Sequence, residues 1–67
     1  MDNNFGKNLR DLRLAEKFSQ EYVAEALNTT KYSISAWELG KQEPDIKTIL
    51  LIAQFFGVST DYLLGAK

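Results

Sequence analysis

The side chains best suited to binding chemistry gather between residues 30 and 36. If this run is helical and Ile34 and Trp37 face the core, then each residue turns by about 100°, and the opposite face points outward. The outward face and its flanks carry one ammonium group, hydroxyl groups and a methyl group: Thr30, Lys31, Tyr32, Ser33, Ser35 and Ala36. These groups can contact base edges and phosphates of duplex DNA. The plain alternative is a solvated polar helix face.

Two residues outside this run could bind the DNA backbone. Gln20 is expected at the first position of another helix, where its amide and the free backbone N–H groups can donate to a phosphate. Lys41 follows the expected end of the second helix and can approach a phosphate. The ordinary alternatives are an exposed glutamine and a solvated lysine.

Arg13 and Glu38 are expected to form a structural salt bridge. Each lies beside core positions of its own predicted helix. Such a bridge would fix the angle of the second helix, although desolvation of the two charges offsets much of their attraction.

The element that must position these side chains is a helix-turn-helix over residues 20–37. Val23 faces the core and the small Ala24 lets a second helix approach. Asn28 tolerates the left-handed conformation that reverses the chain, and Thr30 can cap the helix that follows. This is the helix-turn-helix geometry.

The whole sequence predicts an all-α, compact five-helix domain spanning residues 1–67. Asp2, Asn3 or Asn4, then Ser19, Thr30, Asp45 and Ser59 are the expected N-caps. The expected helices cover about residues 4–17, 20–27, 31–39, 46–56 and 60–64, with a loop over residues 40–44. Nothing in the composition indicates a second domain or a linker.

The composition excludes several classes of protein. Cysteine and histidine are both absent, which removes disulfides, thiol nucleophiles, zinc sites and the usual general base. The carboxylates are scattered, so no enzyme, metal, cofactor or small molecule is expected. The longest apolar run, Ile49 to Ala53, is far too short for a membrane span, and the N-terminus lacks the pattern of a signal peptide. We therefore expect a cytoplasmic protein.

The fourth predicted helix carries two apolar stripes, and one face cannot hold both. The first stripe is Ile46, Ile49, Leu50, Ala53 and Phe56 or Gly57. The second comprises Leu51, Phe55 and Val58, and Tyr62 would extend it onto the fifth helix. An exposed second stripe would be a self-association surface. Burial under the fifth helix is the alternative.

Taken together, these residues resemble the DNA-binding domain of Cro and lambda-repressor-type regulators, the xenobiotic-response-element family of helix-turn-helix proteins. The resemblance extends over essentially the whole chain, and its matching segments are 5–13, 18–20, 34–38, 40–44 and 56–65. The resemblance implies that Gln20 binds a phosphate, that Lys31, Tyr32 and Ala36 face bases, and that the arginine and glutamate named above pair. It also implies a twofold homodimer on a palindromic operator with half-sites about 34 Å apart.

Three residues depart from the family pattern. Asn28 replaces a common glycine, while Ala36 and Leu39 stand where arginine or another polar residue is frequent. With a net charge of −1, these departures keep open a protein-interaction module that has lost DNA contact. The first prediction remains a sequence-specific, double-stranded DNA-binding regulator of transcription, with repression as its expected action.

Overall fold

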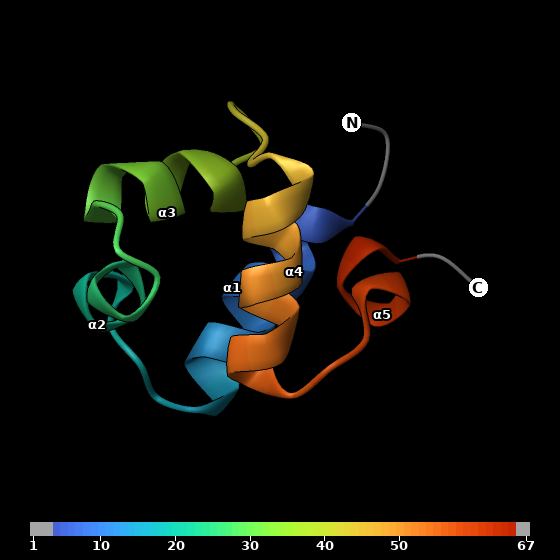
Figure 1. The fold of residues 1–67 in the computed structure, drawn as a ribbon. Helices are drawn as coiled ribbons and strands as arrows, with labels where there is room; N and C mark the ends of the chain where they lie inside the picture. Colours follow the sequence, from blue (N-terminus) through green and yellow to red (C-terminus); the bar gives the residue numbers. More distant parts are fainter. Residues whose placement is uncertain (1–3, 66–67) are drawn as a thin grey trace.

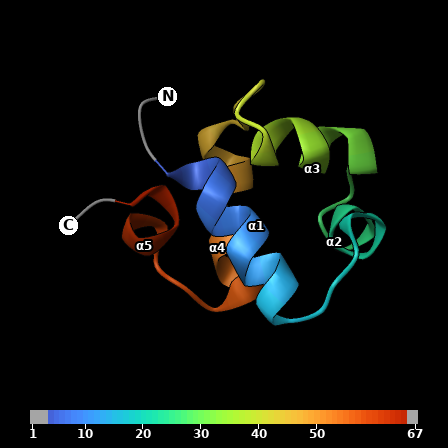
Figure 2. The same ribbon diagram turned by 180° about the vertical axis from the view of Figure 1, so that it is seen from behind.

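The computed structural model describes residues 4–65 and folds them into five α-helices. They are α1 (Phe5–Ala15), α2 (Gln20–Ala26), α3 (Lys31–Glu38), α4 (Ile46–Phe56) and α5 (Thr60–Leu64). Viewed as in Figure 1, α2 and α3 lie on one side of α4, and α5 lies on the other. Figure 2 shows the same arrangement from behind, with α1 in front of α4. The prediction of an all-α, five-helix fold is confirmed.

Local sequence sets where four of these helices begin. The side chain of each N-cap accepts a hydrogen bond from the backbone N–H three residues further on, which satisfies a donor that the helix leaves free. The N-caps are Ser19, Thr30, Asp45 and Ser59, with distances of 2.9, 3.2, 2.8 and 2.9 Å. Hydrogen bonds from the side chain of Thr48, and then from its backbone N–H, hold the pKa of the Asp45 carboxyl below its usual value. All four predicted caps are confirmed.

The first helix has no side-chain cap of this kind. Asn4 occupies its N-cap position without a side-chain hydrogen bond to the helix. The other two candidates, Asp2 and Asn3, lie outside the described residues.

Left-handed residues set where α1 and α2 end. Asn28 has φ of 58°, and the N–H of Thr29 donates to the carbonyl of Ala24 at 2.8 Å, as in a Schellman motif. Lys17 takes the same left-handed conformation after α1, with φ of 59°, and the N–H of Phe18 donates to the carbonyl of Arg13. The sequence did not indicate this turn. Helix α1 therefore ends at Ala15 rather than near residue 17. Helices α2 and α3 each end one residue before the predicted position.

One fully buried side chain from each described helix meets in the core. These are Leu9, Val23, Ile34, Ile52 and Leu63. Because every helix contributes one, removing any helix would expose the others, and none of the five is an independent unit. Phe18 packs against this cluster.

The predicted first stripe of α4 is partly wrong. Ile49 and Ala53 are buried as expected, but Ile46 is 77% exposed and Leu50 is 48% exposed. The buried face instead includes Ile52. Helix α4 is apolar at most positions, so several stripes satisfy the helical period and only packing chooses between them.

Gly6 allows α1 to pass close to the end of α3. A Cβ atom at this position would lie 2.6 Å from the carbonyl oxygen of Trp37 and 2.7 Å from that of Glu38. Both neighbours are backbone atoms, so neither can move aside cheaply. The glycine is therefore a steric requirement of the contact between α1 and α3.

We predict that Gly6→Ala destabilises the fold. Helix propensity alone would make this substitution stabilising by roughly 0.5–1 kcal/mol, whereas the clash should cost about 1–3 kcal/mol. Urea denaturation should therefore show a lower free energy of unfolding. A rise in that free energy would show that the close approach of the two helices is not required.

Candidate nucleic-acid interface

The two helices of the predicted helix-turn-helix pack tightly against each other. Ala24 of α2 is 3% exposed, and Ile34 of α3 is fully buried. Residues 27–30 join the helices, with Asn28 reversing the chain and Thr30 capping α3. Trp37 is buried, which confirms a core position and not a base-stacking one. The predicted motif is confirmed in each of these features.

The face of α3 opposite this core is open. Lys31 and Tyr32 are both exposed, and the exposed fraction of Tyr32 is 75%. The Lys31 ammonium lies 5.6 Å from the centre of the Tyr32 ring, within the range of a cation–π contact. The remaining residues of this face, Ser33, Ser35 and Ala36, are half-buried. Figure 1 shows α3 at the edge of the molecule, where a long partner can lie along it.

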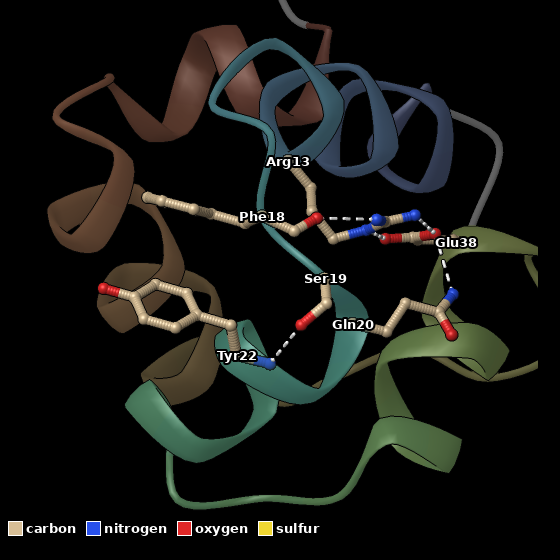
Figure 3. Close-up of polar contacts among 6 residues, drawn as sticks. All are labelled: Arg13, Phe18, Ser19, Gln20, Tyr22 and Glu38. Atoms are coloured by element: carbon tan, nitrogen blue, oxygen red, sulfur yellow. Dashed lines mark hydrogen bonds and ion pairs between the residues drawn. The ribbon is translucent and has the colours of Figure 1, made fainter.

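Arg13 and Glu38 form the predicted salt bridge, and both are buried. Nε of the arginine donates to Oε2 at 2.6 Å, and Nη2 donates to Oε1 at 3.0 Å. The side chains are 10% and 3% exposed. Nη1 also donates to the carbonyl of Phe18 at 2.9 Å (Figure 3). The hydrogen bond to Glu38 raises the pKa of Arg13, so the guanidinium remains charged.

Gln20 joins the same cluster, which sequence reasoning missed. Its Nε2 donates to Oε1 of Glu38 at 3.1 Å (Figure 3). One glutamine amide carries two N–H donors, so this bond leaves the second free to contact a phosphate. The three side chains, which we call the Arg13–Glu38–Gln20 cluster, connect α1, the start of α2 and the end of α3. No spacing rule signals this link, because its members are far apart in the chain.

Lys41 lies just beyond α3, as predicted. Its backbone N–H donates to the carbonyl of Ala36 at 2.9 Å, which fixes the chain as it leaves the helix. The side chain is exposed and makes no hydrogen bond or ion pair within residues 4–65. Its ammonium group is therefore available to a partner.

The structure divides the four residues of the predicted self-association surface. Leu51 and Phe55 line a groove of about 410 Å³ between α4 and the end of α2, together with Ala26, Leu27, Asn28 and Gln54. Val58 is half-buried against the core. Tyr62 is exposed on α5, on the other side of α4 from α2. The groove therefore contains only the first two.

The described part of the chain holds neither a metal-binding cluster nor a membrane-spanning helix. No three His, Cys, Asp or Glu side chains between residues 4 and 65 gather as a metal site would need. None of the helices there is long and apolar enough to span a membrane.

Comparison with known proteins supports this geometry. A family model described as helix-turn-helix matches residues 9–63. The chain belongs to this helix-turn-helix family. The family expected from the sequence is thereby confirmed.

Two relatives come from Bacillus subtilis strain 168. The SPbeta prophage-derived HTH-type transcriptional regulator YonR is 40% identical over 60 residues, which cover 90% of this chain and 56% of that protein. The HTH-type transcriptional regulator YqaE is 42% identical over 63 residues, covering 94% of this chain and 54% of that protein. The chain thus spans about half the length of the curated relatives it matches.

A solved structure extends the likeness to a complex with DNA. The P22 c2 repressor protein, crystallised with a synthetic operator, superimposes with a TM-score of 0.87 and 27% sequence identity. The match covers 94% of this chain and 96% of that chain. The fold is therefore one that occurs in an operator-bound repressor.

We predict that breaking the buried salt bridge from one side is costly. Arg13→Met leaves the Glu38 carboxylate buried without its cation, which should lower the free energy of unfolding by roughly 3 kcal/mol. The double variant Arg13→Met, Glu38→Met removes both charges and should be more stable than the single variant. Chemical denaturation of the three proteins measures the difference. Equal stability of Arg13→Met and the unaltered chain would contradict the assignment.

Proposed function

We propose that this chain is a sequence-specific, double-stranded DNA-binding regulator of transcription. The observation that carries this proposal is the open face of α3, the second helix of the helix-turn-helix, on which Lys31 and Tyr32 are exposed. The major groove of B-DNA is about 12 Å wide and admits one α-helix. Helix α3 would enter it by its N-terminal half, as recognition helices do.

The relatives favour this function over the alternative of a protein-interaction module. YonR and YqaE are both named as transcriptional regulators, and the P22 c2 repressor was crystallised with an operator. By analogy with that repressor, occupation of an operator that blocks transcription is the simplest action. Because YonR and YqaE come from a bacterium, whose chromosome lies in the cytoplasm, we propose the same location for this chain.

The interface residues divide into two groups in this proposal. Lys31, Tyr32, Ser33, Ser35 and Ala36 lie on or beside the α3 face that would contact base edges, and Thr30 begins it. Gln20 and Lys41 stand at either end of the motif, where their donors can reach the two flanking phosphates. The first group would set sequence preference and the second would set affinity.

A second copy of the chain would strengthen a modest contact. The α3 face lacks arginine, so one domain should bind weakly. Two domains related by a twofold axis would occupy a palindromic site with half-sites about 34 Å apart. We propose that Leu51 and Phe55, which line the groove, contribute to the surface between the copies. Val58 and Tyr62, which lie outside the groove, would extend that surface. Apolar side chains that remain exposed on a small domain are suited to such a contact.

We predict different effects for the two groups of interface residues. Selection from a random duplex library should recover a twofold-symmetric site, and Tyr32→Ala should alter the bases preferred at one position of each half-site. Lys41→Gln should instead weaken binding to all sequences and lower the salt slope by about 1. Selection that enriches no sequence would contradict sequence-specific binding.

We predict that Leu51→Glu disrupts self-association. A carboxylate in the groove would have to be desolvated when a second copy covers it. Sedimentation at micromolar concentration should show a dimer for the unaltered chain and a monomer for the variant. Leu14→Glu is the matched control, because Leu14 is similarly exposed but lies on α1 outside the groove. An unaltered chain that sediments as a monomer, on DNA and off it, would exclude this surface.

A further inference from the structure

A hollow between α1, the start of α2 and α3 has no role in the function proposed so far. Its volume is about 590 Å³. Lys7, Arg10 and Asp11 line it from α1, Gln20 lines it from α2, and Ser35 lines it from α3. The buried Arg13–Glu38 pair, whose charges cancel, also borders it.

The remaining charges leave this hollow positive. Lys7 donates to Asp11 at 2.9 Å, so these two exposed side chains largely neutralise each other. Arg10 is exposed and makes no ion pair or hydrogen bond with any residue between 4 and 65. Its guanidinium is therefore the uncompensated charge of the hollow. A guanidinium offers paired donors that match two oxygens of one phosphate.

The hollow adjoins the surface that would face DNA. Ser35 belongs both to the outward face of α3 and to the lining of the hollow, and Leu39 extends that lining past the end of the helix. Gln20, with one amide N–H free, borders it from the other side. A DNA strand that passes Gln20 beside α3 would therefore bring a phosphate near Arg10.

We propose that Arg10 binds a DNA backbone phosphate at this hollow, so that the DNA-binding surface extends from the helix-turn-helix onto α1. This proposal rests on the DNA-binding function proposed above. It gives the chain a guanidinium contact, which α3 cannot supply because it has no arginine. Asp11 opposes the contact by holding Lys7 and by adding a negative charge near the phosphate.

The test is the salt dependence of binding to a random-sequence duplex. The logarithm of the binding constant should fall linearly with the logarithm of salt concentration, with a slope of about −0.9 per neutralised phosphate. Arg10→Gln should make the slope shallower by about 0.9, whereas Arg10→Lys should retain it. Asp11→Asn should tighten binding.

Lys17→Gln is the matched control. It removes the same charge from the turn that follows α1, and Lys17 does not line the hollow. Its slope should equal that of the unaltered chain. If Lys17→Gln and Arg10→Gln reduce the slope equally, the effect is one of general charge and the proposal is wrong. An unchanged slope for Arg10→Gln also overturns it. If the unaltered chain does not bind duplex DNA, the proposed function itself fails, and the variants are not needed to show it.

Discussion

The arrangement of the proposed DNA-binding surface depends on one buried carboxylate, that of Glu38. Glu38 accepts hydrogen bonds from two nitrogens of Arg13 and from the amide of Gln20. These bonds connect the first three helices at the point where α3 ends. Burying two charges is expensive, so the cluster adds little net stability compared with an apolar packing. Its effect is geometric, because it holds α2 and α3 at one angle and holds the Gln20 side chain beside the surface that would meet DNA.

In the proposed function, this constraint would let a sparse α3 face contact DNA. Beside Lys31 and Tyr32, that face has only the short side chains of Ser33, Ser35 and Ala36, and it has no arginine. Short side chains must be held close to the bases to reach them, so the frame has to be rigid. The tight packing at Ala24 and the absence of a side chain at Gly6 both reduce the separation of the helices around α3. In the proposed function, affinity then depends on groups around the motif, such as Lys41, and on a second copy.

Local signals made much of the fold predictable from the sequence. The four side-chain caps, the turn at Asn28 and the inward positions of Ile34 and Trp37 depend on residues within one or two turns of each other. The salt bridge between Arg13 and Glu38 was predictable because both lie beside core positions. Features that depend on packing between distant helices were not. The bond from Gln20 to Glu38, the steric role of Gly6 and the burial of Ile52 in place of Leu50 all belong to this second class.

The left-handed residue Lys17 is an instructive exception, because it is local and was still missed. Lysine carries no special preference for that conformation, unlike glycine or asparagine. The strain is accepted because Phe18 must turn back onto the core, where its carbonyl also receives a hydrogen bond from Arg13. Tertiary contacts therefore override the local preference at this one turn.

We propose that this small, slightly acidic chain binds duplex DNA through a local positive surface. The most direct measurement is the affinity of the unaltered chain for a random-sequence duplex at a series of salt concentrations. We expect binding at low salt, with the logarithm of the binding constant falling linearly as the logarithm of the salt concentration rises. The slope should be about −2 per domain, because Lys41 and Arg10 would each neutralise one phosphate. Absence of binding at low salt, or binding that does not respond to salt, would contradict it.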